Sequence, residues 1–151
     1  MPSPSVSDDP NVLLLSGAIP ETRFAGSLLL YRLLQGYPPE RICAVGPKPH
    51  AQSELLPIRY EYLAPTRSAR LNLTRFAGLK RSLEAIGLAG RIPLARVDAA
   101  IASFTPDVVV SVMERHDYVD AAYRFAQRTR VPLVLIVHDR LESFELVYPI
   151  F

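Results

Sequence analysis

The sequence is dominated by short apolar runs that alternate with segments of helical periodicity. The runs lie at 12–15, 42–45, 107–112 and 131–137, and the helical segments between them lie at 26–35 and 117–129. Short runs without polar alternation are typical of strands that are buried on both faces of a parallel sheet. The chain therefore divides into strand-helix-strand units, which predict an α/β fold.

Two such units joined through a third strand predict an open, doubly wound parallel sheet of the Rossmann-like kind, in a three-layer α/β/α arrangement. The third strand is expected at 58–63, where apolar and polar residues alternate as they do near a sheet edge. Further helices are expected over 68–89 and 93–105, and Asp117 is the expected N-cap of the last helix. Right-handed crossovers then give the strand order 3-2-1-4-5.

Composition predicts a single folded domain. The 151 residues are 49% hydrophobic and 21% charged, so we expect a domain over 11–151 preceded by a flexible tail at 1–10. The single cysteine, Cys43, excludes an internal disulfide and is interpreted as a packed core residue, which makes the cytoplasm the expected compartment. The N-terminus lacks the pattern of a secretory signal, and no apolar run reaches the ~18 residues of a membrane span.

Several nucleotide-binding and hydrolase motifs are absent. No Gly-x-Gly-x-x-Gly follows the first strand, no loop ends in Gly-Lys-Ser/Thr, and no Gly-x-Ser-x-Gly turn occurs. These absences argue against a nicotinamide dehydrogenase, a P-loop nucleotidase and an α/β-hydrolase. No cluster of cysteine and histidine offers a metal site, so we expect neither a metal nor a cofactor.

The topology selects candidate site residues without any motif. In open parallel sheets, ligands bind beyond the carboxyl ends of the strands where the winding reverses, here between the first and fourth strands. His138 and Asp139 directly follow the last apolar run, so we expect them at the rim of the sheet. The other selected residues follow the first strand, begin the first helix or follow the fourth strand: Ser16, Gly17, Gly26, Ser27, Glu114 and His116.

These residues also have purely structural interpretations. Gly17 and Gly26 serve either tight turns and close packing, or the approach of backbone N–H groups to an anion or a sugar hydroxyl. Glu114 and His116 are either ligand contacts or, together with Arg115 between them, solvated loop residues ahead of a helix. His50, in a proline-rich loop, offers nothing specific.

Three stretches together resemble the N-terminal half of a GT-B glycosyltransferase of family 4. They are GSLLLYRLLQGYPPERICAVGP at 26–47, FTPDVVVSV at 104–112 and VPLVLIVHD at 131–139. The resemblance covers residues 11–140 and implies an acceptor-side domain, which works with a second domain that binds the nucleotide sugar. The E-x7-E pair that marks the donor-binding half does not occur in this chain. The resemblance therefore implies half of an active site, inactive alone, whose partners are a nucleotide sugar and a hydroxyl acceptor.

The resemblance also implies roles for the rim residues. His138, Asp139 and His116 would be catalytic. The remaining residues would contact the acceptor or the donor: Ser16, Gly17, Gly26, Ser27 and Glu114.

Charge and apolar patterning predict other contacts. A net charge of +2, without interleaved aromatic residues in the basic stretch, argues against nucleic-acid binding. The basic residues of 68–89 form either a solvated face or a peripheral contact with anionic lipid at the inner face of a membrane: Arg70, Arg75, Lys80 and Arg81. The apolar stretch 146–151 predicts self-association. The alternative to sugar transfer is a stand-alone, non-catalytic Rossmann-like module that binds a small anion or a protein partner.

Overall fold

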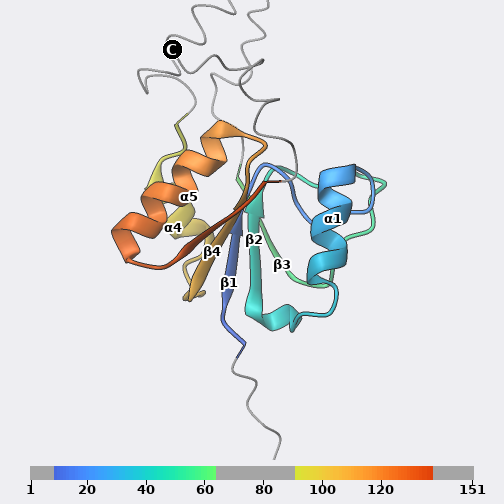
Figure 1. Ribbon diagram of the computed structural model, residues 1–151, viewed down its shortest axis with the longest axis horizontal. Coiled ribbons are helices and arrows are strands. Elements are labelled where there is room, and N and C mark those ends of the chain that lie inside the picture. The colour runs from blue at the N-terminus through green and yellow to red at the C-terminus, as the bar shows by residue number, and fades with distance from the viewer. Residues whose placement is uncertain (1–8, 64–90, 138–151) are drawn as a thin grey trace, which may run out of the picture.

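The computed structural model describes residues 9–63 and 91–137. Its centre is a sheet of five parallel strands in the order β3-β2-β1-β4-β5 (Figure 1). The strands are β1 (Val12–Leu15), β2 (Ile42–Gly46), β3 (Arg59–Tyr62), β4 (Val108–Val112) and β5 (Leu133–Ile136). The predicted parallel sheet and its strand order are confirmed.

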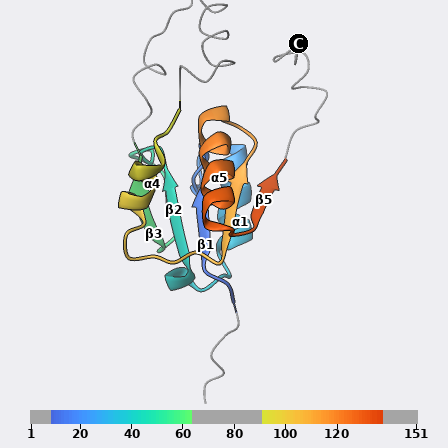
Figure 2. The ribbon, with the colours of Figure 1, turned by 90° about the vertical axis from the view of Figure 1, so that its left-hand side faces the viewer.

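Helices lie on both faces of this sheet. Helix α1 (Ala25–Leu34) covers one face, and helices α4 (Leu94–Ala100) and α5 (His116–Thr129) cover the other, as Figure 1 and Figure 2 show. A short 3-10 helix, η1 (Pro39–Arg41), leads into β2. The protein therefore has the predicted three-layer α/β/α architecture of a Rossmann-like fold.

The central strand β1 is buried along its whole length and pairs with both β2 and β4. Because side chains alternate along a strand, Leu13 and Leu15 pack in the core under α4 and α5, whereas Leu14 packs with Leu30 of α1. Cys43 of β2 is also fully buried in the first of these cores. The unbroken apolar run at 12–15 thus reflects burial on both faces of the sheet.

Helix α4 is shorter than the sequence predicts. It ends at Ala100, and Ile101 leaves the helical conformation with φ −103° and ψ 13°. A turn follows, in which the backbone N–H of Phe104 donates to the carbonyl of Ile101 at 2.6 Å. Phe104 nevertheless packs against the core, which explains why the apolar spacing continues beyond the end of the helix.

The expected N-cap of α5 is wrong by two positions. Arg115 is the N-cap, in an extended conformation, and the helix begins at His116. Asp117 lies in the first turn, where a carboxylate interacts favourably with the helix dipole. Its side chain accepts hydrogen bonds from the Arg115 guanidinium, and its Oδ1 also accepts one from the backbone N–H of Tyr118 at 3.2 Å.

The strand β5 differs from its prediction in length and in burial. It spans four residues within the predicted 131–137. It forms one edge of the sheet, and β3 forms the other edge as predicted. Val134 is 47% exposed and Leu135 is 42% exposed, although their sequence is as apolar as that of β1.

Residues 1–8, 64–90 and 138–151 lie outside the described residues. They include most of the expected tail, the predicted basic helix with Arg70, Arg75, Lys80 and Arg81, and the apolar stretch 146–151. Of the tail, Pro10 is described, and its carbonyl accepts a hydrogen bond from the hydroxyl of Tyr37 at 2.6 Å.

Candidate functional site

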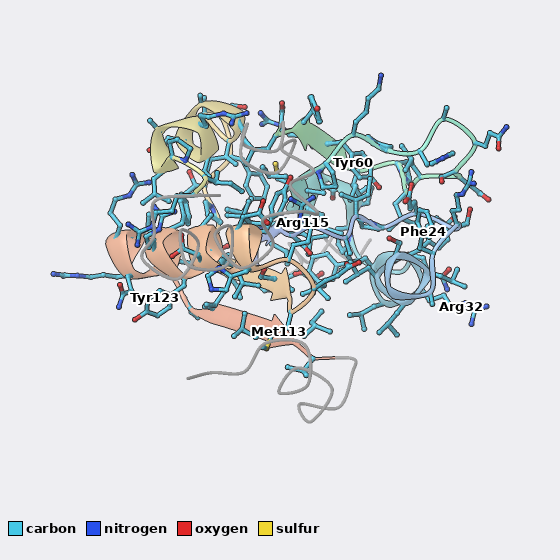
Figure 3. All side chains as sticks on the ribbon, turned by 90° about the horizontal axis from the view of Figure 1, so that it is seen from above. Phe24, Arg32, Tyr60, Met113, Arg115 and Tyr123 are labelled. Atoms are coloured by element: carbon cyan, nitrogen blue, oxygen red, sulfur yellow. The ribbon has the colours of Figure 1, made fainter. Side chains whose placement is uncertain are left out.

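The winding of the sheet reverses between β1 and β4, at the edge that faces the viewer in Figure 3. The loops 16–24 and 113–115 leave these two strands at this edge, which we call the rim. Open parallel sheets bind their ligands at such a reversal. The predicted switch between the first and fourth strands is confirmed.

Gly17 and Arg115 bring these two loops into contact. A Cβ atom added to Gly17 would lie 2.6 Å from Cδ, 2.7 Å from Cγ and 2.8 Å from Cβ of Arg115. Such distances are far inside ordinary van der Waals contact, so the Arg115 side chain occupies the space that a larger residue at 17 would need. Gly17 thus allows close packing between the loops that follow β1 and β4.

Asp117 holds the guanidinium of Arg115 in one orientation. Arg115 Nε donates to Oδ1 of Asp117 at 3.2 Å, and Nη2 donates to Oδ2 at 2.8 Å. The guanidinium carbon also lies 5.3 Å from the centre of the Tyr118 ring. The Arg115 side chain is 36% exposed. No described residue bonds to Nη1, so its two N–H groups remain for a ligand at the rim.

Tyr118 anchors the first turn of α5 to the far side of the sheet. The side chain is fully buried, and its hydroxyl donates to the carbonyl oxygen of Leu63, just after β3, at 3.0 Å. Burial raises the pKa of Tyr118 to about 12, because the phenolate would lose its hydration. The phenol therefore stays protonated at neutral pH and acts as a hydrogen-bond donor.

The loop after β1 is packed rather than open. The Ser16 hydroxyl is buried and accepts a hydrogen bond from the backbone N–H of Ala18 at 3.1 Å. Ile19 and the Ser16 carbonyl lie against Gly46, where an added Cβ would be 2.7 Å from Ile19 Cγ2 and 2.7 Å from Ser16 O. This close approach is possible only because residue 46 has no side chain.

A small antiparallel bridge between Glu21 and Leu55 ties the same loop to the β2–β3 connection. Glu21 is only 5% exposed, and its Oε2 accepts a hydrogen bond from the backbone N–H of His50 at 3.1 Å. The backbone N–H of Thr22 donates to the carbonyl of Glu54 at 3.2 Å. The entry to α1 is therefore fixed relative to β2 and β3.

Around the start of α1, polar and aromatic side chains gather at the surface. Arg23 Nη1 lies 2.8 Å from Nδ1 of His50, and the His50 ring meets Phe24 edge-on with ring centres 6.4 Å apart. His50, in which the sequence showed nothing specific, is thus part of a contact between the two loops. A cavity of about 180 Å³ lies nearby, with Ile19 and Tyr60 among its lining residues.

The structure describes six of the predicted site residues, and Ser16 and Gly17 lie in the packed loop after β1. Glu114 and His116 are exposed and flank Arg115 at the rim. Gly26 and Ser27 lie in the first turn of α1, and Ser27 is buried there. His138 and Asp139 follow Val137 directly but lie outside the described residues, so their roles stay predictions.

Two negative observations apply to the residues described. No group of three histidine, cysteine, aspartate or glutamate side chains there could hold a metal ion. Within the same ranges, no helix has both the length and the apolar character needed to cross a membrane.

Comparison of this chain with protein-family models, with curated proteins and with solved structures finds no match. The fold assignment therefore follows from the sheet and its flanking helices alone.

Arg115 makes the contact between the two loops, although the sequence predicts it only as a solvated loop residue and selects its neighbours Glu114 and His116 as candidate site residues. An arginine in a short loop between a strand and a helix has the pattern of a solvated side chain. The signal for its contact is the combination of Asp117, two positions later, with Gly17 after β1, because the topology places those two loops together.

Proposed function

We propose that this domain supplies the acceptor side of an enzyme that transfers a sugar from a nucleotide sugar to a hydroxyl group. The observation that carries the proposal is the contact between Gly17 and Arg115 across the β1–β4 switch. It joins the two loops for which the resemblance to family 4 glycosyltransferases implies contacts with the acceptor or the donor. The three resembling stretches support the same function.

In the proposed reaction, a bond forms between the acceptor oxygen and the anomeric carbon, and the bond from that carbon to the nucleoside diphosphate breaks. Glu114 and His116 are exposed beside Arg115, where they can hold acceptor hydroxyls. A histidine, His116 or His138, takes the hydroxyl proton, and His138 with Asp139 would orient the sugar or the acceptor. Stabilising the charge on the departing diphosphate is the task of a donor-binding domain. The E-x7-E pair that marks such a domain does not occur in these 151 residues.

The second candidate function is binding of a small anion without catalysis. The observation that favours it is the guanidinium of Arg115, fixed on one side by Asp117 and with Nη1 remaining. A preoriented guanidinium loses little conformational entropy on binding a carboxylate or phosphate. This function needs neither His116 nor His138.

Calorimetric titration separates the two functions. The probes are methyl glycosides of common hexoses as neutral acceptors and pyrophosphate as an anion. If the domain is an acceptor side, a methyl glycoside binds, His116→Ala weakens that binding by about tenfold, and the chain alone releases no diphosphate from nucleotide sugars. Turnover by these 151 residues alone would overturn the half-site proposal.

The matched control uses a second arginine that is paired with an aspartate. Arg128 pairs with Asp98 away from the rim. If the domain is an anion-binding module, pyrophosphate binds, Arg115→Gln abolishes the binding and Arg128→Gln leaves it unchanged. Equal losses in both variants would show that the rim makes no specific contribution.

A further inference from the structure

An apolar strip lies on the α1 side of the sheet, between α1 and the edge strand β5. Ile136 packs with the core under α1, so the alternation along β5 places Val134 on the same face. Val134 is 47% exposed in spite of this position. Among the described helices, α1 is the one on this face, and it leaves β5 incompletely covered (Figure 1).

Helix α1 provides the other side of the strip. Leu30 faces the sheet, and the hydroxyl of Tyr31 donates to Glu54 at 3.2 Å, so the Tyr31 flank of α1 faces the β2–β3 connection. Around the helix axis, Leu29 and Leu33 lie on the other side of Leu30 from Tyr31. They therefore occupy the flank of α1 toward β5. Leu29 is 46% exposed and Leu33 is 62% exposed. The strip is therefore defined by Leu29, Leu33, Val134 and Ile136.

The strip suits an amphipathic helix of the same chain. The described part of the chain ends at Val137, directly after the carboxyl end of β5, and the sequence continues from there into 138–151. In 139–148, Asp139 and Glu142 have the spacing of a capping box, and Leu141, Phe144 and Tyr148 recur at helical spacing. A helix over 140–148 would be about 14 Å long, close to the roughly 13 Å of a four-residue strand.

Charge and area also favour this occupant. Arg32 of α1 is exposed beside Leu29 and Leu33 and points away from the sheet in Figure 3. Glu142 and Glu145 of the segment are suitable partners for it. A second copy of the protein is a poorer occupant, because four partly exposed side chains fall far short of the ~800 Å² that each partner buries in a stable dimer.

The opposite face of β5 suits such a helix less well. Its neighbour on α5 is Tyr123, whose hydroxyl accepts a hydrogen bond from Gln127 at 2.6 Å and is polar. The hollow on that side, of about 440 Å³, is lined by Val131 and Leu133 at the amino end of β5, which is the end farther from residue 138. Leu135 on this face is 42% exposed near the carboxyl end, but its helix-side neighbour is the polar-tipped Tyr123 rather than a pair of leucines.

We propose that the strip formed by Leu29, Leu33, Val134 and Ile136 is the docking site for residues 139–148 of the same chain, which bind it as a helix. The docked segment completes the helical layer on the α1 side of β5. This proposal does not rest on the proposed function, and Asp139 is the one residue that the two share.

Amide hydrogen exchange of the full 151-residue protein, measured by mass spectrometry on peptides from 140–148, tests the proposal. Protection of at least tenfold over the unstructured rate is expected. Leu33→Glu, which places a charge in the strip, should remove that protection. Tyr123→Glu, which changes another exposed apolar side chain, on the other face of the sheet, should retain it.

Three results would overturn the proposal. They are unprotected amides over 140–148 in the unmodified protein, protection that survives Leu33→Glu, and protection lost in Tyr123→Glu. The exchange is repeated at two protein concentrations with light scattering, because protection that appears only in a dimer assigns the strip to a second copy instead. Phe144→Asp tests the contact from the other side, and it too should remove the protection while the circular dichroism of the sheet is retained.

Discussion

Replacing Gly46 by alanine should destabilise the protein through a steric clash at the rim. The added Cβ would lie 2.7 Å from the carbonyl oxygen of Ser16 and 2.7 Å from Cγ2 of Ile19. Ordinary contacts begin near 3.4 Å, so both neighbours must retreat by about 0.7 Å or more. The Ser16 carbonyl cannot move freely, because Ser16 N–H is itself bonded to the Val45 carbonyl at 3.2 Å.

Overpacking of this kind typically costs about 1–3 kcal/mol, which for a domain of this size lowers Tm by roughly 2–12 °C. Urea titration followed by circular dichroism gives the free energy of unfolding, and an unchanged m-value shows that the native state is retained. Gly36→Ala is the matched control, because an alanine Cβ there meets nothing within 4 Å. We expect that variant to be neutral or more stable by up to about 1 kcal/mol. Equal stability of Gly46→Ala and Gly36→Ala would refute the steric argument.

Two further predictions concern α5. The pKa of Tyr118 is raised from 10.0 to about 12, so the protonated phenol stabilises the folded state below pH 10 and that contribution, about 3 kcal/mol at most, is lost as the pH rises toward 12. Tyr118→Phe should therefore lower the free energy of unfolding by about 1 kcal/mol at neutral pH, because it removes the hydrogen bond to Leu63. In urea titrations at rising pH, the variant should lose less of its free energy of unfolding than the unmodified protein does. Parallel pH profiles of the two proteins would contradict this. Arg130 caps α5 with φ 59°, in the left-handed region, so Arg130→Gly should raise the free energy of unfolding by about 0.5–1 kcal/mol, whereas a decrease would mean that its side chain makes a stabilising contact.

The sequence predicted the sheet well because burial on both faces leaves a strong local pattern. β1 has its predicted bounds, because the apolar run lies between two polar residues, Asn11 and Ser16. The edge position of β3 was also predictable, because its polar residues alternate with apolar ones. These patterns depend on each strand's own neighbours and need no knowledge of distant segments.

The errors arose where distant contacts decide the outcome. The apolar spacing of 94–104 does not reveal that the helix stops at Ala100, because Phe104 reaches the same core from a turn. Likewise, Asp117 looks like an N-cap until Arg115 is known to hold its carboxylate. An apolar sequence such as that of β5 shows that a strand needs covering, but it does not identify what covers it.

The candidate site was predictable in position and less so in composition. Strand order alone placed the loops after β1 and β4 at one edge, and Gly17 and Arg115 are indeed in contact there. The identity of the contacting residues required the structure, because nothing local distinguishes Arg115 from a solvated arginine. The contribution of His138 and Asp139 stays a prediction.

Helix α5 also makes hydrogen bonds to both described ends of the connection between β3 and α4. The Tyr118 hydroxyl bonds to the carbonyl of Leu63, and Arg124 Nη2 bonds to the carbonyl of Ile92 at 2.8 Å. Both ends of this connection are therefore positioned by one helix. A substitution that shifts α5 would move Leu63 and Ile92 together, so the β3 edge and the entry to α4 respond to α5 as a pair.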